Sequence, residues 1–139
     1  MFELHPQLAN DCVEVGDLKL CKVLLLNDSL YPWLILVPRR QGVREIFQLS
    51  ADDQLQLITE SSAVGKVLMA YFSADKLNVA ALGNVVPQLH LHHVLRYKTD
   101  PTWPKPVWGG VAPQPYSAGQ LAQRLTEIRE QLLPLGLNG

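Results

Sequence analysis

Three of the four histidines of this chain lie within four consecutive positions, in the run Gln88–Val94, which reads Gln-Leu-His-Leu-His-His-Val. The imidazole side chain has an unperturbed pKa close to neutrality, so it can accept a proton, donate one, attack an electrophile or bind a metal. If the run is a β-strand, the alternation of side chains puts Gln88, His90 and His92 on one face. His93 then points to the opposite, apolar face. Two imidazoles beside a carboxamide predict a catalytic or phosphate-handling site.

Two other interpretations of the histidines stay open at this point. Buried histidines are often hydrogen-bonded to the backbone and serve only the core. A metal site built on His90 and His92 would need further ligands, since zinc is held by three or four protein groups. His93 is a poor candidate for such a ligand because it lies on the other face of the expected strand. We expect a structural or interface role for His93.

The histidine run belongs to a longer apolar stretch, Val85–Tyr97, that we expect to form one strand. Alternating or continuous apolar residues predict four earlier strands, at Cys12–Val15, Leu18–Leu26, Pro32–Pro38 and Lys76–Leu82. Gly16-Asp17 is typical of a tight hairpin turn between the first two. The third strand is followed by Arg39, Arg40 and Arg44. These arginines have two interpretations, a phosphate-binding group and a solvated loop.

Two helices are expected, one before and one after the histidine run. The first runs from Ser50, a good N-cap, to about Phe72. Its apolar stripe is expected to comprise Leu55, Ile58, Ser62, Gly65 and Met69, widened by Leu57, Val64 and Leu68. The second runs from Ser117 to Leu133, and Ser117 with Gln120 forms a candidate capping box. Its apolar stripe is expected to comprise Leu121, Leu125, Ile128 and Leu132.

This order of elements predicts an α+β fold, an antiparallel five-stranded sheet with one long helix packed on it plus a C-terminal helix. The length of 139 residues is typical of a single domain, 1–139. We expect its core at about 10–98, followed by a Pro/Trp-rich segment and helix at 99–139. The Pro/Trp-rich segment is too apolar for a linker, so we expect it to pack against a dimer partner or the rim of a pocket.

Composition limits the partners. The formal net charge is −1, so no global basic field attracts nucleic acid, and no nucleic-acid partner is expected. No signal peptide is evident at the N-terminus, and no apolar stretch is long enough to span a membrane. Cys12 and Cys21 do not form a CxxC motif, and two reduced, packed thiols are expected. The expected location is therefore cytoplasmic.

The histidine run resembles the signature of the histidine triad (HIT) family, His-φ-His-φ-His-φ-φ with φ apolar, in a bacterial branch whose motif begins with Gln. Leu26-Asn27-Asp28 followed by Trp33–Arg39 resembles the second landmark of that family. This landmark is a polar turn with an acidic residue, then a strand that ends in Pro-Arg. The long helix falls between the two landmarks, as in the family. The likeness covers about residues 10–98.

The resemblance implies a nucleotide-binding hydrolase or nucleotidyl transferase that acts at the α-phosphorus of phosphoramidates or dinucleoside polyphosphates. It implies that His90 forms a covalent nucleotidyl-histidine and that His92 hydrogen-bonds phosphate or leaving-group oxygens. The turn at Asn27 and Asp28 would bind the nucleotide, with Asp28 on the ribose hydroxyls. Asn84 is our candidate for the polar, phosphate-binding position ahead of the motif. The resemblance also implies a homodimer, and the scheme needs no metal and no cofactor.

Gln88 stands where the family signature has its first histidine. A carboxamide can orient a neighbouring imidazole but cannot exchange a proton near neutral pH. Acid–base chemistry would then rest on His92, on the substrate or on water. The alternative function is therefore a nucleotide-binding module with little or no turnover. Both functions require the rings of His90 and His92 to reach a cleft.

Overall fold

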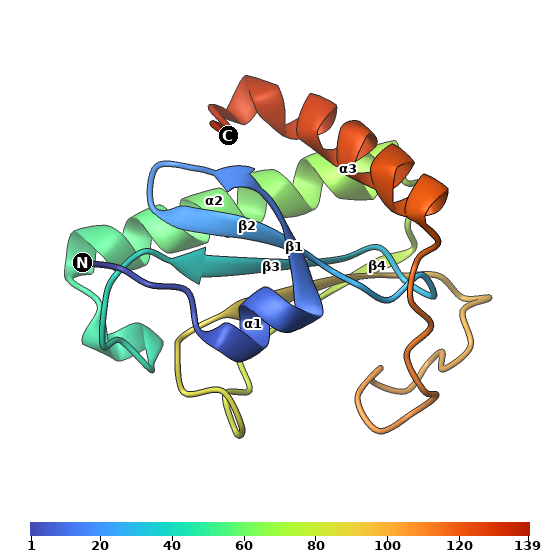
Figure 1. Ribbon diagram of the computed structural model, residues 1–139, viewed down its shortest axis with the longest axis horizontal. Coiled ribbons are helices and arrows are strands. Elements are labelled where there is room, and N and C mark those ends of the chain that lie inside the picture. The colour runs from blue at the N-terminus through green and yellow to red at the C-terminus, as the bar shows by residue number, and fades with distance from the viewer.

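The computed structural model describes all 139 residues. Five strands form one antiparallel sheet in the order β1-β2-β3-β5-β4 (Figure 1). The strands are β1 Cys12–Asp17, β2 Cys21–Leu26, β3 Trp33–Pro38, β4 Lys76–Ala80 and β5 Leu91–Arg96. The helices are α1 Pro6–Asp11, α2 Ala51–Tyr71 and α3 Ala118–Leu132, with short 3₁₀ turns η1 Ile46–Gln48 and η2 Leu133–Leu135. The predicted α+β architecture is confirmed.

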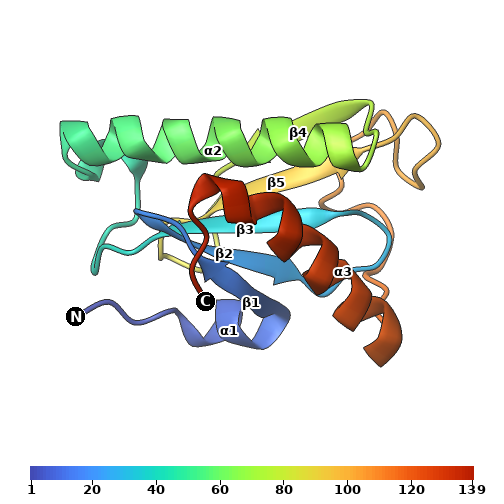
Figure 2. The ribbon, with the colours of Figure 1, turned by 90° about the horizontal axis from the view of Figure 1, so that it is seen from above.

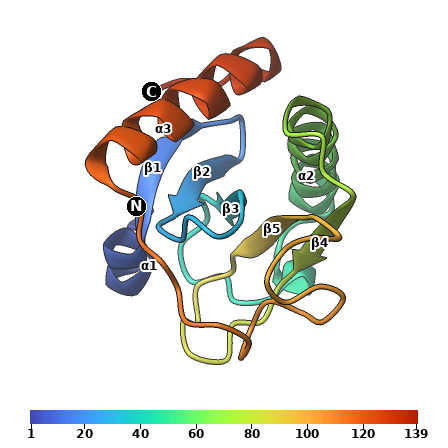
Figure 3. The same cartoon turned by 90° about the vertical axis from the view of Figure 1, so that its right-hand side faces the viewer.

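Two helices cover one face of the sheet. α2 lies over the β4–β5 end and α3 over the β1–β2 end, whereas α1 lies beyond β1 on the other side (Figures 2 and 3). The predicted helix starts are confirmed, because the Ser50 hydroxyl accepts the N–H of Asp53 at 3.1 Å. Ser117 and Gln120 form the reciprocal bonds of a capping box. The larger apolar core lies between the sheet and these two helices.

The buried face of α2 differs from the predicted stripe. Leu55 and Ile58 are 66% and 57% exposed. The buried residues are Leu57, Glu60, Ser61, Val64, Gly65 and Leu68. The buried face includes a polar contact with the β1–β2 hairpin. The Glu60 carboxylate accepts the backbone N–H groups of Leu20 and Cys21 at 2.8 and 2.9 Å. The predicted stripe was chosen from apolar residues alone. It therefore lies on a different side of α2 from the face that buries this acid.

The predicted turn at Gly16-Asp17 is also wrong. β1 continues through both residues, with a bulge between Glu14 and Gly16, and the chain turns between Asp17 and Cys21. Gly16 is needed for a close approach of backbones: a Cβ there would lie 2.6 Å from the carbonyl oxygen of Asn138. The C-terminal segment passes over β1 at this point.

The outer edge of β1 is occupied by two parts of the chain. Asp17 and Asn138 exchange backbone hydrogen bonds of 2.6 and 2.8 Å. The Arg129 guanidinium of α3 donates to the carbonyl oxygens of Val15 and Glu14, each at 3.0 Å. Backbone groups of Glu14, Val15 and Asp17 on this edge therefore have partners within the chain.

The strand predicted from Val85 begins only at Leu91, and β4 ends at Ala80 rather than at Leu82. Leu91 is the first residue of β5 and the first that pairs with β3. Before it, the N–H of Leu89 donates to the carbonyl oxygen of Val43 at 3.0 Å, so this segment bonds to the loop after β3 instead of the sheet. The predicted alternation nevertheless holds for the side chains, since Leu89 and Leu91 pack in the helix-covered core.

Three further observations bear on the composition. Both cysteines are unpaired, and burial, with a smaller contribution from Asp11, raises the pKa of the Cys12 thiol to about 12. None of the helices combines the length and apolarity needed to cross a membrane. No group of three or more His, Cys, Asp or Glu side chains is arranged to hold a metal ion.

Candidate active site

His90 is held by the backbone immediately before β5. Its Nδ1 lies 2.7 Å from the carbonyl oxygen of Gln88. A carbonyl oxygen only accepts, so Nδ1 carries the proton, and in the neutral ring Nε2 keeps its lone pair. The ring is 7% exposed and borders a cavity of about 10 Å³, which is also lined by Arg44, Gly83 and Gln88. Nε2 of His90 is therefore a nucleophile or acceptor with a narrow opening beside it.

His92 has the opposite tautomer. Its Nδ1 lies 3.0 Å from Nε1 of Trp33. An indole N–H only donates, so Nδ1 of His92 accepts, and the neutral ring carries its proton on Nε2. Burial, and to a lesser degree the neighbouring rings of His90 and His93, lowers the pKa of His92 to about 4. His92 is therefore neutral near pH 7 and offers an N–H donor.

The two rings are neighbours with complementary functions. Their centroids are 5.0 Å apart and their planes are inclined by 70°. His90 presents a lone pair and His92 presents a proton, both on Nε2. Such a pair can attack an electrophilic phosphorus while donating a hydrogen bond to one of its oxygens.

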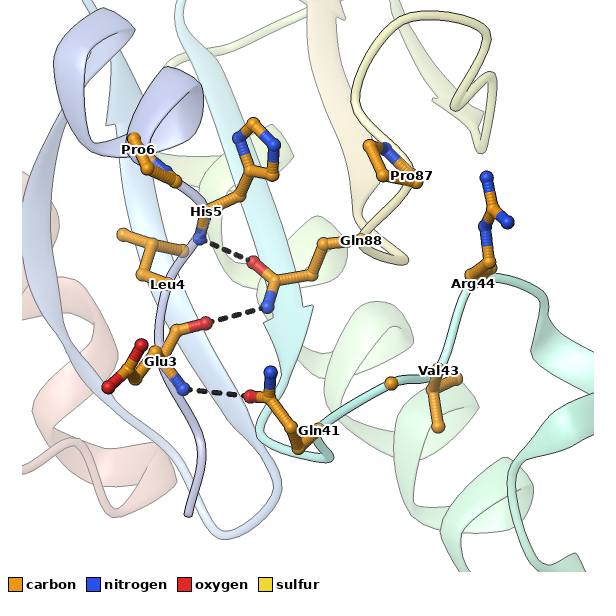
Figure 4. Close-up of a pocket in the computed structure, with 10 residues that line it drawn as sticks. Glu3, Leu4, His5, Pro6, Gln41, Val43, Arg44, Pro87 and Gln88 are labelled. Atoms are coloured by element: carbon orange, nitrogen blue, oxygen red, sulfur yellow. Dashed lines mark hydrogen bonds between the residues drawn. The ribbon is translucent and has the colours of Figure 1, made fainter.

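The Gln88 side chain does not contact the histidine rings through its carboxamide. Its Oε1 accepts the backbone N–H of His5, and its Nε2 donates to the carbonyl oxygen of Glu3, both at 2.8 Å (Figure 4). The carboxamide thus fastens the N-terminal segment, while the main-chain carbonyl of Gln88 orients His90. A catalytic contribution of Gln88 is supported only through this carbonyl.

His93 lies on the opposite face, as the alternation predicts. Its Nε2 is 2.7 Å from the hydroxyl of Ser61 in α2, and its Nδ1 is 3.1 Å from the carbonyl oxygen of Leu91. The Nδ1–H group donates to this carbonyl oxygen, so Nε2 of the neutral ring accepts from the Ser61 hydroxyl. Burial lowers the pKa of His93 to about 4, against a smaller opposing effect of the bond to Leu91. This histidine joins β5 to α2.

The predicted nucleotide-binding residues are not hydrogen-bonded to the histidine rings. Oδ1 of Asn27 accepts the N–H of Tyr116 at 2.9 Å. Oδ1 of Asp28 accepts the N–H groups of Leu30 and Gln114 at 3.1 and 3.2 Å. Both side chains therefore hold the segment that leads into α3. Asn84 is exposed and does not line the cavity beside His90. The binding of nucleotide by these three residues stays a prediction.

Two tryptophans lie beside His92, and neither was among the predicted site residues. Trp33 and Trp108 both meet His92 edge-on, with centroid distances of 5.7 and 5.1 Å. Trp33 could have been found, because it shares a face of β3 with Ile35, the partner of His92. The only signal for Trp108 was the apolarity of the Pro/Trp-rich segment, which predicted packing against a dimer partner or the rim of a pocket.

The Trp108 ring that contacts His92 also lines two surface cavities of about 400 and 500 Å³. Of the two histidines, only His90 borders one of the cavities described here, and that cavity holds about 10 Å³. A cleft that reaches both rings stays a prediction.

The two depressed histidine pKa values predict a loss of stability in mild acid. The unfolded chain binds protons near the ordinary pKa of 6.5, whereas folded His92 and His93 bind them only near 4. The free energy of unfolding should therefore fall as the pH drops from about 6.5 towards 4, by a few kcal/mol in total. Urea unfolding at pH 7, 6 and 5 measures this fall.

A double variant isolates one of the two histidines. Replacing His93 by Phe together with Ser61 by Ala removes the titrating ring and its hydroxyl partner. The free energy of unfolding should then fall less steeply as the pH drops. Equal stability of the wild-type protein at pH 7 and pH 5 would contradict a buried, neutral histidine pair.

Comparison with known proteins agrees with this geometry. The HIT domain family model matches residues 7–99. The chain is similar to a histidine triad protein from Marinobacter aquaeolei VT8, at 52% identity over 97% of this chain and 96% of that one, with a TM-score of 0.89. It is also similar to histidine triad proteins from Bradyrhizobium japonicum (45% identity, 94% and 97% covered, TM-score 0.91) and Sinorhizobium meliloti (40%, 95% and 98%, 0.91). No curated protein matches it significantly. The chain therefore belongs to the HIT domain family.

Proposed function

We propose that this protein binds a nucleotide and transfers its nucleotidyl group, to water or another acceptor, through a covalent intermediate on His90. The observation that carries the proposal is the pair of opposite tautomers. Hydrogen bonds of 2.7 and 3.0 Å leave a lone pair on Nε2 of His90 and a proton on Nε2 of His92. A site that served only the core would not need this complementarity at two adjacent rings, one at the start of β5 and one immediately before it.

The proposed reaction has two displacements at the α-phosphorus. In the first, Nε2 of His90 forms a bond to phosphorus while the bond to the leaving group breaks, and the leaving group takes the electron pair. Nε2–H of His92 donates a hydrogen bond to an oxygen of the phosphoryl group. In the second, water attacks phosphorus, the N–P bond breaks, and His90 regains its lone pair as a water proton passes to bulk solvent.

The proposed reaction needs more room at the histidines than the structure offers. A cavity of about 10 Å³ beside His90 is far smaller than the several hundred Å³ typical of ligand pockets. Trp108 is followed by Gly109 and Gly110, its ring meets that of His92 edge-on, and it lines the cavity of about 500 Å³ formed by residues 101–111. We infer that substrate enters as this indole swings away from His92.

The test is a search for the covalent intermediate. The purified protein is mixed with a nucleoside phosphoramidate or a dinucleoside polyphosphate, quenched within one turnover, and analysed by intact mass and peptide mapping. A nucleotidyl adduct on His90, with steady release of nucleoside monophosphate, supports the proposal. Tight nucleotide binding without adduct or turnover would instead establish the binding module, in keeping with the absence of a proton-exchanging group at Gln88.

We also propose that the protein acts as a homodimer joined at the β4 edge of the sheet. β4 is an outer strand and Val79 on it is 47% exposed. Leu55 and Ile58 of the overlying α2 are exposed as well. An open strand edge with apolar neighbours is a surface that favours pairing with another chain.

Sedimentation at micromolar concentration tests the dimer. The wild-type protein should sediment as a dimer, and Val79→Asp should shift it to the monomer because a charge on an edge strand opposes pairing. A wild-type protein that is monomeric at this concentration contradicts the proposal. As a matched control, Leu133→Asp changes an exposed leucine in η2, away from β4, and should leave the dimer intact.

The unpaired state of Cys12 and Cys21 supports the cytoplasm as the location of this protein.

A further inference from the structure

The proposed nucleophile lies outside the β-sheet. β5 begins at Leu91, and its pairing with β3 and β4 includes no earlier residue. The only backbone–backbone hydrogen bond of residues 88–90 runs from the N–H of Leu89 to the carbonyl oxygen of Val43, at 3.0 Å. The sheet therefore fixes the backbone of His92, whereas the position of His90 depends on the other contacts of a short segment that no strand pairs with.

Gln88 makes the side-chain contacts that hold this segment. Its Oε1 accepts the N–H of His5, and its Nε2 donates to the carbonyl oxygen of Glu3, each at 2.8 Å (Figure 4). The carboxamide thus pairs with the backbone of residues 3–5 as a peptide group of a neighbouring strand would. Its two partners lie 83 and 85 positions away in the sequence, so these bonds join distant parts of the chain.

The same residue contacts His90 through its main chain. The carbonyl oxygen of Gln88 lies 2.7 Å from Nδ1 of His90 and accepts its proton. This bond leaves the lone pair on Nε2, the atom that attacks phosphorus in the proposed reaction. Gln88 is therefore bonded to the N-terminal segment by its side chain and to the nucleophile by its backbone.

We propose that Gln88 is a positioning residue for His90, and that the backbone of residues 3–5 is part of the frame that holds the nucleophile. A carbonyl that is fixed in place keeps the imidazole in one tautomer and one orientation before substrate binds, whereas a mobile carbonyl does not. The catalytic consequence rests on the proposed function. The positioning itself does not, because it concerns the ligand-free protein.

This role gives a physical reason for a carboxamide at position 88. An amide carries its acceptor and its donor side by side, so it can bond to an N–H and a carbonyl of one extended segment. A neutral imidazole also has one donor and one acceptor, but its two nitrogens point in diverging directions. Gln88→His restores the first histidine of the family signature, yet it should lose this pair of bonds and lower kcat. A higher kcat in this variant would contradict the positioning role.

A substitution at His5 removes one of the two bonds from the far side. His5 has φ −57° and ψ 135°, which proline also adopts, so His5→Pro deletes the N–H that Gln88 accepts without redirecting the chain. It also removes the imidazole, which accepts the N–H of Gln7 at 3.0 Å. His5→Ala is therefore the matched control, since it removes the same imidazole and keeps the backbone N–H.

Nitrogen NMR spectra of the ligand-free protein, recorded under mildly alkaline conditions, report the state of the His90 ring. Wild type and His5→Ala should show one tautomer, with the proton on Nδ1. In His5→Pro and Gln88→Met, a second tautomer should appear, and the Nδ1 proton should exchange with water faster by about 10-fold or more. A single tautomer with unchanged exchange in both variants would overturn the proposal, whether or not the protein turns over a substrate.

Kinetics with a nucleoside phosphoramidate test the catalytic consequence. His5→Pro should have a kcat lower than that of His5→Ala by about 10-fold or more, and Gln88→Met should show a similar loss, with KM nearly unchanged. The double variant His5→Pro with Gln88→Met should lose no more than Gln88→Met alone, because both changes act on the same bond. Losses that multiply in the double variant would show that His5 does not act through Gln88.

Gln41→Met separates positioning from a general loosening of the N-terminal segment. Oε1 of Gln41 accepts the N–H of Glu3 at 3.0 Å, so this variant frees the same segment without touching Gln88 or His90. It should keep the His90 tautomer, and kcat within about twofold of wild type. A loss equal to that of Gln88→Met would overturn the positioning role. If the wild-type protein turns over no substrate, the proposed function fails, and the NMR comparison alone decides the role of Gln88.

Discussion

Replacing His90 by Ala should abolish both turnover and the covalent nucleotidyl adduct, with a loss in kcat of at least about 10³-fold. His90 is the only histidine that lines the small cavity, and its Nε2 keeps a lone pair because Nδ1 donates to the carbonyl of Gln88. His92 cannot replace it, since its own Nδ1 is occupied by Trp33 and its Nε2 carries a proton. Single-turnover assays with mass analysis measure the loss.

His90→Asn provides the structure-preserving version of this experiment. The asparagine amide can still donate to the carbonyl of Gln88, but it has no nucleophilic nitrogen. It should be as inactive as His90→Ala while keeping nucleotide affinity and thermal stability near wild type. Normal turnover by either variant, or an adduct that maps to His92, would contradict the assignment of His90 as nucleophile.

The largest loss of stability from a single substitution outside the candidate site is expected at Arg96. This arginine is 1% exposed and donates to Asp100 twice, at 2.8 and 3.0 Å, and to Asn78 at 2.9 Å. It also lies over the rings of Tyr31 and Trp103, at 5.8 and 5.5 Å from their centroids. Replacing it by Met leaves the Asp100 carboxylate buried without its charge partner. We expect a cost of about 3–5 kcal/mol in the free energy of unfolding, measured by urea titration.

Arg40→Met is the matched control for the stability of Arg96→Met. Arg40 and Asp53 form an ion pair of similar length, 2.7 Å, but the arginine side chain is 48% exposed. The cost there should be below about 1 kcal/mol. Similar costs for the two variants would show that burial of the Arg96–Asp100 pair does not set its contribution. A second variant, Arg96→Lys, keeps the charge but loses the planar guanidinium group. Its cost in the free energy of unfolding should lie between those of Arg96→Met and Arg40→Met.

The features of the site that could be predicted from the sequence are those set by alternation and by composition. The alternation of side chains placed His90 and His92 on one face and His93 on the other, although the strand itself begins at Leu91. Periodicity and caps gave the helix starts at Ser50 and Ser117. Alternation, periodicity and capping depend on residues that are near one another in the sequence. They can be read without knowing which distant segments contact each other in the fold.

The features that could not be predicted depend on contacts between distant segments. Gly16 looks like a turn residue until the C-terminal Asn138 is seen to cross it. Glu60 looks like a surface acid of α2 until its bonds to the hairpin are known. The same holds for Gln88, whose carboxamide serves the N-terminal segment, and for Trp108, which reaches His92 from an irregular segment. No sequence period encodes such pairings.

The two edges of the sheet are unequal, and this limits how many copies can join. Arg129 and Asn138 bond backbone groups of Glu14, Val15 and Asp17 in β1, which opposes pairing of that strand with a neighbouring molecule. β4, the other outer strand, pairs with β5 alone. A sheet that can grow at a single end is complete after one addition, because the second copy brings its own blocked β1 to the outside. The Arg129 contact and the bridge at Asn138 thus protect the protein from growing into open-ended fibres.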